Sequence, residues 1–277
     1  MPVALALLSS LIWGSIDFVG GTTSRDLAPA TVMLWSTIVA LPLLALVAVL
    51  SGDLTLDAAV VGWGAFAGVS GAVGLTALYQ GLATGVMGVV APISSTSVLV
   101  PVLVGVAQGD DLSPVQVAGV VVAVAGVVLA GGPHLREFRT GGHRPVLWAL
   151  LAALGLGAAL TALAYGSESS SVSTLLVQRL FYVLVPLAVV LATRVPRVPR
   201  ARHVVPLGTI GAGDMTANGL FAVASRSGPL AVIAVVSALY PVATVLLARQ
   251  IQHERLERIQ VIGVVAALVG VAATVAG

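Results

Sequence analysis

Two stretches that repeat each other decide the fold: residues 110–127 read DDLSPVQVAGVVVAVAGV, and residues 254–271 read ERLERIQVIGVVAALVGV. Nine of these 18 positions are identical at an offset of 144 residues. Valine and alanine identities carry little weight in so apolar a chain, but other matches do: Leu112/Leu256, Gln116/Gln260, Gly119/Gly263, Gly126/Gly270 and, further out at offsets of 143, 144 and 140 residues, Gly14/Gly157, Pro42/Pro186 and Pro101/Pro241. The chain therefore contains two copies of one unit. We expect them at residues 1–132 and 145–277, with a linker at 133–144.

The amino-acid composition indicates whether the protein is surrounded by water or by lipid. Hydrophobic residues make up 58% of the 277-residue chain and charged residues 9%, and the mean hydropathy is +1.08. Such a chain has too little polar surface to cover a water-soluble globule, whereas stretches of about 20 apolar residues cross a bilayer as helices. The apolar stretches continue to the last residue, which argues against a secretory signal on a soluble domain. We predict an all-α integral membrane protein.

Ten transmembrane helices are predicted from the apolar stretches between charged or Gly/Pro/Ser-rich breaks: 3–22, 29–50, 58–83, 86–107, 113–132, 145–165, 172–193, 204–224, 228–248 and 257–276. Each repeat receives five helices, so the second copy must enter the membrane from the opposite side to the first. The sequence thus predicts two inverted five-helix repeats. This architecture recurs in secondary transporters, because exchanging the conformations of the halves turns an outward-open cavity into an inward-open one.

Arginine placement predicts the orientation. All 13 basic residues are arginines; 11 of them fall in odd-numbered loops and only Arg226 falls in an even-numbered loop. The positive-inside rule then places the odd loops, including the linker, in the cytoplasm. We expect a multi-pass protein of the inner (plasma) membrane with both termini outside.

Several chemistries are excluded or disfavoured. The chain has no cysteine, which excludes disulfides and thiolate catalysis, and its four scattered histidines have no metal-binding spacing. We therefore expect no metal and no cofactor. The basic stretch RVPRVPRARH at 194–203 is too short and too rich in proline for a nucleic-acid-binding arm, so nucleic acid is not expected as a partner.

Three ionisable residues fall inside predicted helices: Asp17 in the first, Arg179 in the seventh and Asp214 in the eighth. Each costs about 2.5 to 3.5 kcal/mol to insert and is retained only for a reason. The opposite directions of the seventh and eighth helices bring Arg179 and Asp214 to similar depth, so an ion pair is feasible. That pair could simply orient two helices, or it could handle substrate or protons. Asp17 could likewise handle substrate or protons, or it could simply be hydrated near the cytoplasmic interface.

Uncharged polar residues add further candidates for a central cavity. The fourth helix contains APISSTSVLVP at 91–101, whose prolines leave backbone carbonyls free for hydroxyls or for a ligand. Part of this polarity is expected to be ordinary packing, because serines in membrane helices usually bond their own backbone. The substrate-binding candidates are Trp13, Asp17, Tyr79, Gln80, Ser94, Ser95, Arg179, Asp214, Asn218, Ser237 and Tyr240.

The acidic residues at the heads of the quoted repeats have a structural interpretation. Asp110 and Glu254 stand at equivalent loop-to-helix junctions, where a carboxylate can cap the amides of the helix that follows. The matched prolines, Pro42/Pro186 and Pro101/Pro241, are expected to mark bends.

One motif points to an enzyme. Residues 211–214 spell GAGD, a form of the GxGD signature of intramembrane aspartyl proteases, whose chemistry needs two carboxylates that share a proton. The second aspartate of those proteases follows a tyrosine, but Asp17 follows Ile16, and their Pro-Ala-Leu motif is absent. We do not expect an enzyme.

The residues resemble a known family. Trp13-Gly14 in the first helix, a proline in the fourth and ninth, and Glu254-Arg255-Leu256 leading into Gln260 and Gly263 are similar to the EamA-type ten-helix transporters of the drug/metabolite transporter superfamily. The first repeat departs from this pattern by offering Asp110 as its acidic residue, and the sixth helix has no tryptophan at the position that matches Trp13. The resemblance implies export or exchange of small metabolites, such as amino acids, through a cavity lined by helices 1, 3, 4, 6, 8 and 9.

We therefore expect a secondary transporter or exporter of amino-acid-like or drug-like solutes that works by alternating access. The alternative is an uncoupled facilitator or exchanger on the same fold. The expected partners are a small-molecule substrate, the lipid bilayer and, as a candidate coupling ion, the proton. The sequence leaves the solute, the direction of transport and the oligomeric state open.

Overall fold

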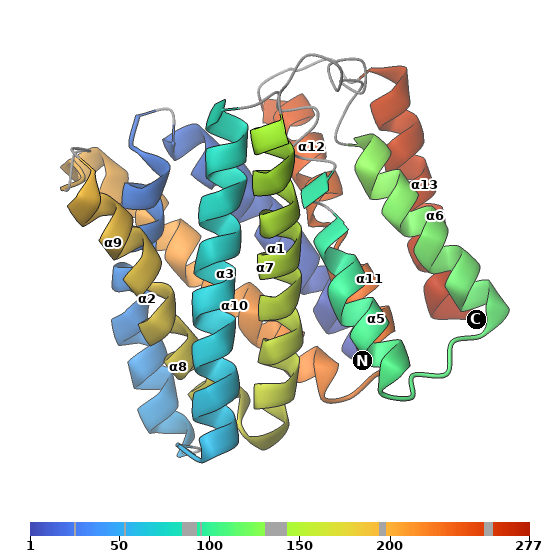
Figure 1. Ribbon diagram of the computed structural model, residues 1–277, viewed down its shortest axis with the longest axis horizontal. Helices are drawn as coiled ribbons and strands as arrows, with labels where there is room; N and C mark the ends of the chain where they lie inside the picture. Colours follow the sequence, from blue (N-terminus) through green and yellow to red (C-terminus); the bar gives the residue numbers. More distant parts are fainter. Residues whose placement is uncertain are drawn as a thin grey trace.

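The computed structural model describes residues 1–24, 26–52, 54–84, 93–94, 96–130, 143–193, 198–251 and 257–277, with the side chains of a few of them left out. Within these ranges the regular structure is entirely helical (Figure 1). The elements are α1 (Pro2–Thr23), α2 (Pro29–Ser51), α3 (Ala58–Thr84), η1 (Thr96–Val98), α5 (Leu99–Ala107), α6 (Pro114–Ala130), α7 (His143–Ser169), α8 (Ser171–Tyr182), α9 (Leu184–Ala192), η3 (Ala201–His203), α10 (Val204–Ser225), α11 (Leu230–Ser237), α12 (Tyr240–Ile251) and α13 (Arg258–Ala276).

The described elements match the ten predicted spans, the fourth only from residue 93 onward, and two spans are broken near their prolines. The seventh span divides into α8 and α9 just before Pro186, which lacks the N–H that would bond the carbonyl of Tyr182. The ninth divides into α11 and α12, and Pro241 follows the break directly. In the fourth, the η1 turn precedes α5, which contains Pro101. At Pro42 the expected bend does not interrupt α2, which a membrane helix allows because one missing hydrogen bond is tolerated.

The contacts between helices obey a two-fold exchange of the repeats. The contact of α3 with α7 has its counterpart in α10 with α1, that of α3 with α8 in α10 with α2, and that of α5 with α7 in α12 with α1. Pairs that join equivalent helices, such as α6 with α13 and α2 with α8, map onto themselves. Figure 1 shows α6 and α13 side by side at one end of the bundle. The predicted two-repeat, all-helical membrane architecture is thus confirmed.

Matched glycines form the crossing of α6 and α13. A Cβ on Gly126 would meet the backbone of Ala267, and a Cβ on Gly270 would meet the backbone of Ala123. The offset of 144 residues that relates the two glycines also relates the two alanines. Small residues of this kind let helix backbones approach closely in a bilayer, where burial of apolar surface does not drive association. These repeat identities are therefore explained by packing.

The matched glutamines complete two helix caps. At the start of α6, Ser113 Oγ accepts a hydrogen bond from the N–H of Gln116 (3.2 Å), and Gln116 Oε1 accepts one from the N–H of Ser113 (2.8 Å). At α13, Glu257 and Gln260 form the same reciprocal capping box. The box satisfies N–H groups that the first turn of a helix leaves without partners.

Asp110 does not cap α6, in contrast to the expectation above. Its Oδ2 accepts a hydrogen bond from the N–H of Ala231 at 3.0 Å, in the first turn of α11. The carboxylate therefore caps a helix of the other repeat, which sequence spacing alone cannot reveal. Glu254 lies outside the described residues.

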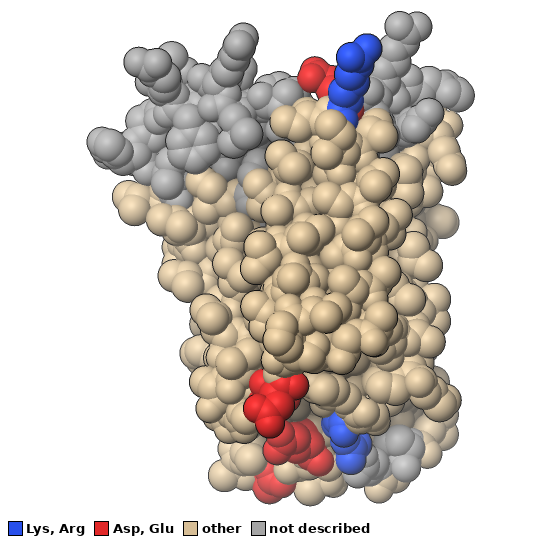
Figure 2. Space-filling model, turned by 90° about the vertical axis from the view of Figure 1, so that its right-hand side faces the viewer, with Lys and Arg blue, Asp and Glu red and all other residues tan. Residues whose placement is uncertain are grey.

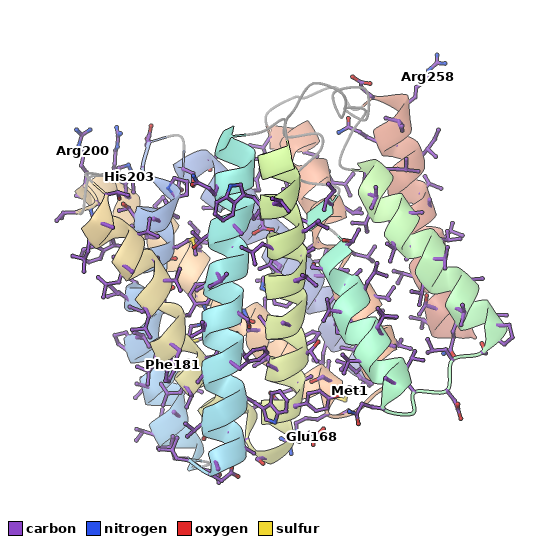
Figure 3. All side chains as sticks on the ribbon, in the orientation of Figure 1. Met1, Glu168, Phe181, Arg200, His203 and Arg258 are labelled. Carbon is purple, nitrogen blue, oxygen red and sulfur yellow. The ribbon has the colours of Figure 1, made fainter. Side chains whose placement is uncertain are left out.

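The bundle has two polar ends separated by an apolar band. Arg200, His203 and Arg258 lie at one end and Met1 and Glu168 at the other (Figure 3); we call these ends the odd-loop face and the even-loop face. Figure 2 shows acidic and basic residues near the even-loop end, below a broad surface without charges. Six helices of the described part are long and apolar enough to cross a membrane by length and composition.

The two termini share the even-loop face. Gly228, in the loop before α11, lies beside Pro2, and Gly277 lies beside Ser113. A common face for both ends agrees with an even number of membrane crossings.

Candidate functional site

A small cavity of about 70 Å³, partly open to solvent, lies among α1, α2, α3, α8 and α10. Asp17 is six residues from the odd-loop end of α1, and Asp214 is midway along α10. At 1.5 Å per residue the cavity therefore extends from the odd-loop half of the bundle to about its middle. Its lining comprises Ile16, Asp17, Gly20, Val32, Met33, Ser36, Thr37, Leu75, Arg179, Tyr182, Ile210, Gly211 and Asp214.

An ion pair between Arg179 of α8 and Asp214 of α10 forms one wall. The guanidinium contacts Asp214 Oδ2 directly, as the depth argument predicts, and only 4% of the Arg179 side chain and 28% of the Asp214 side chain are exposed. The guanidinium carbon of Arg179 also lies 5.4 Å from the ring centre of Tyr182, a cation–π contact. The arginine is thus held by partners on two helices.

Asp214 is engaged on both carboxylate oxygens. Oδ1 accepts hydrogen bonds from Trp13 Nε1 (3.1 Å) and from Asn218 Nδ2 (3.0 Å), while Oδ2 faces Arg179. Asn218 Nδ2 also donates to the carbonyl of Asp214 at 2.8 Å. Every partner of the carboxylate is a donor, which suits an ionised acid. The network joins α1, α8 and α10.

Asp17 lines the same cavity with an exposed side chain and has no ion-pair partner among the described residues. The cavity wall therefore contains two carboxylates, Asp17 and Asp214, and one guanidinium, Arg179. A cationic group entering the cavity would find an acid that protein contacts do not neutralise.

The glycines of the GxGD sequence have a packing role. A Cβ on Gly211 would run into the carbonyl oxygen of Ser36 on α2, and a Cβ on Gly213 would run into the side chain of Ile16 on α1. Because Asp214 is committed to an arginine rather than to a second acid, the contacts do not support an aspartyl protease dyad.

Aromatic and small residues fill the interior of the bundle on the even-loop side of the ion pair. The ring of Trp13 lies 6.1 Å from Phe221 and 6.5 Å, edge-on, from Tyr240. Phe221 is fully buried, and Ser9 Oγ donates to the carbonyl of Ala217 at 2.8 Å, joining α1 to α10. These residues lie on the even-loop side of Asp214.

Other predicted candidates lie away from the cavity. Ser94 is buried and Gln80 is exposed, and neither belongs to the cavity lining. Ser237 is buried in α11, and its hydroxyl has no hydrogen-bond partner among the described residues. Tyr79 belongs to α3, but its side chain is outside the described part, as is Ser95.

Sequence reasoning missed Ser36, Thr37 and Tyr182. Ser36 and Thr37 are adjacent polar residues within a very apolar span, and Tyr182 follows Arg179 by one helical turn. Each offered a weak signal that was not used. Spans 2 and 7 therefore line the cavity, whereas the described residues of spans 4, 6 and 9 do not, in contrast to the lining that the resemblance implied.

Comparison with known proteins identifies the family. The model of the EamA-like transporter family matches residues 1–132 and 143–276. This chain belongs to the EamA-like transporter family. A solved structure titled "Crystal structure of protein" has the same fold, with a TM-score of 0.77 over 99% of this chain and 96% of its own, at 15% sequence identity. A search of the curated proteins found no match. The EamA-like chain is thus a multi-pass membrane protein of a transporter family, and its partners are a small-molecule substrate and the lipid bilayer.

Proposed function

We propose that this EamA-like protein is a secondary transporter that carries small amine-bearing metabolites, such as amino acids or cationic drug-like solutes, by alternating access. The observation that carries the proposal is the cavity in which Asp17, without an ion-pair partner among the described residues, lies beside the Arg179–Asp214 pair. No second function is favoured by an observation of comparable weight.

The charges of the cavity support the solute class. A lone carboxylate inside a membrane protein is costly and is balanced when a cation binds. A solute ammonium group at Asp17 would supply that charge, and a proton could replace it on the return step. A solute carboxylate would find a donor in Arg179, whose Nε has no hydrogen-bond partner among the described residues. An amino acid satisfies both requirements.

The repeat architecture supports the mechanism. The cavity occupies the odd-loop half, while Trp13, Phe221 and Ser9 fill the bundle beyond it. Exchange of the two repeat conformations would open the equivalent space on the even-loop face. With the arginine-rich odd-loop face in the cytoplasm and both termini outside, this is an inward-facing state in the inner (plasma) membrane.

A ligand-binding test addresses the cavity first. The detergent-purified protein is heated in the presence of amino acids, small primary amines and the matching carboxylic acids that lack an amine. We expect selected amines to raise the melting temperature, because a ligand that binds only the folded state stabilises it by about 2.7 kcal/mol at 100 times its Kd. Asp17→Asn should abolish that shift, whereas Asp111→Asn, an exposed acid on the even-loop face, should preserve it.

Uptake into proteoliposomes then separates the transport modes. A coupled transporter accumulates a stabilising solute when a proton gradient is imposed, whereas a facilitator or exchanger only equilibrates it. A solute that stabilises the Asp17→Asn protein as strongly as the wild type would refute the proposed site.

A further inference from the structure

One face of α8 is buried and polar from its first residue to the cavity. Ser171, Thr174, Gln178 and Arg179 stand at positions i, i+3, i+7 and i+8, which form a single stripe on a helix. Their exposed fractions are 6%, 0%, 5% and 3%. The stripe faces the interior of the protein rather than lipid.

The polar atoms of this stripe lack hydrogen bonds. Ser171 Oγ, Thr174 Oγ1, Gln178 Oε1 and Arg179 Nε have no hydrogen-bond partner among the described residues, and neither has Ser167 Oγ at the end of α7. Apart from these residues, only the Ser237 hydroxyl shares that condition in the described part. Each such group costs about 1 to 3 kcal/mol when it is buried dry, so a cluster of them needs an explanation.

Ordinary helix packing does not explain these unbonded polar groups. Elsewhere in the protein, hydroxyls bond the carbonyl four residues earlier, as Thr161 does with Gly157 (2.9 Å) and Thr216 with Ala212 (2.8 Å). Ser171 and Thr174 make no such bond. We call Ser167, Ser171, Thr174 and Gln178 the polar seam.

The polar seam connects the even-loop face with the cavity. At its outer end, Ser173 Oγ accepts a hydrogen bond from the N–H of Thr55 (3.0 Å), which ties α8 to the loop before α3. Thr174 packs against Gly166 of α7. At its inner end, Gln178 adjoins Arg179, which lines the cavity. The seam therefore spans the half of α8 that the present cavity does not reach.

The two-fold relation of the repeats points to the adjoining part of α7 and α8. The offset of 143 residues between Gly14 and Gly157 maps the cavity wall at 16–20 of α1 onto 159–163 of α7, and the offset of 144 residues between Pro42 and Pro186 maps the wall at 32–37 of α2 onto 176–181 of α8. An outward-facing cavity built by that exchange would lie between α7 and α8 on the even-loop side. Gln178 of the seam lies within this stretch of α8, and Thr174, which packs against Gly166 of α7, precedes the stretch by two residues.

We propose that the polar seam is the closed outer half of the solute path. When the odd-loop side closes, α7 and α8 separate, and water and the polar groups of the solute bond the hydroxyls and the amide of the seam up to Arg179. This inference rests on the proposed alternating-access function, but it can be tested without knowing the solute.

The absence of native cysteine allows single cysteines to report water access. Ser171→Cys and Thr174→Cys proteins in liposomes are exposed on the even-loop face to a charged, membrane-impermeant methanethiosulfonate reagent. The matched controls are Val60→Cys on α3 and Ala224→Cys on α10, which are buried near the even-loop ends of their helices and lie off the seam. We expect both seam cysteines to react at least tenfold faster than the controls.

The seam proposal and the proposed transport of amines are refuted by different results. Seam cysteines in folded protein that react no faster than Val60→Cys would overturn the seam proposal even if the protein transports amines. Fast seam labelling without any amine-dependent stabilisation would preserve the path and refute the solute class.

A second variant pair covers a failure of the cysteine proteins to fold. Thr174→Val keeps the shape of the side chain and removes the hydroxyl, while Thr174→Ser keeps the hydroxyl. We expect uptake of a stabilising amine to fall at least fivefold in Thr174→Val and to persist in Thr174→Ser. Full uptake by the valine variant would overturn the seam proposal.

Discussion

Asp214 draws its partners from three helices, and Arg179 is the only charged one among the described residues. If the two charges pair, removing either alone leaves the other uncompensated in the membrane, at a cost of about 3 to 5 kcal/mol. We expect Arg179→Ala and Asp214→Asn each to lower the melting temperature strongly and the double variant to recover much of the loss. A double-mutant cycle on unfolding free energy measures this coupling.

The same variants separate a structural pair from a working one. A stable Asp214→Asn protein that transports at the wild-type rate would limit the aspartate to holding helices together. Additive effects in the stability cycle would contradict the ion pair itself.

For single residues, the sequence predicted the charged members of the cavity well and the uncharged polar members poorly. Asp17, Arg179 and Asp214 stood out because an ionised side chain inside a helix is expensive. Ser36 and Thr37 did not, because a hydroxyl in a membrane helix can satisfy itself on its own backbone and carries no visible cost. Asn218 was found on polarity alone, and its role as a donor to Asp214 needed the structure.

Helix α6 crosses α13 through glycines that leave no room for a side chain. We expect Gly126→Ala to destabilise the protein by about 1 to 3 kcal/mol, because its Cβ would meet the backbone of Ala267 rather than a flexible side chain. Gly62→Ala on α3 is the control, since a Cβ there has open space and alanine favours a helix. Thermal unfolding of both variants tests the crossing, and equal stability of the two proteins would count against it.

The helices themselves followed from the apolar pattern, and their breaks followed largely from proline. The contacts between the two repeats could not be predicted from these patterns. Asp110 was expected to cap the helix next to it, but its carboxylate reaches α11, far away in the sequence. A loop-to-helix junction in the sequence identifies a capping residue only when that residue caps the helix directly after it. Ser113 and Glu257 do so.

For the whole molecule, the arginine distribution predicts orientation. A tag at Met1 and a tag at Gly277 should both be reached by an impermeant reagent from the outer side, whereas a tag within 132–144 should be reached only from the cytoplasm. Protease protection of tagged protein in intact cells and inverted vesicles measures this. Termini on opposite sides would contradict the even helix count.

The central claim is that one cavity is reached alternately from the two faces. The direct measurement is reaction of Ser36→Cys in the cavity with an impermeant thiol reagent applied to either face. A second cysteine pair at Thr55 and Ser173, joined by a short cross-linker, can lock the even-loop face. We predict reaction from both faces before cross-linking, reaction only from the odd-loop face afterwards, and recovery when the link is cleaved. Reaction from a single face before cross-linking, or from both faces after it, would contradict alternating access.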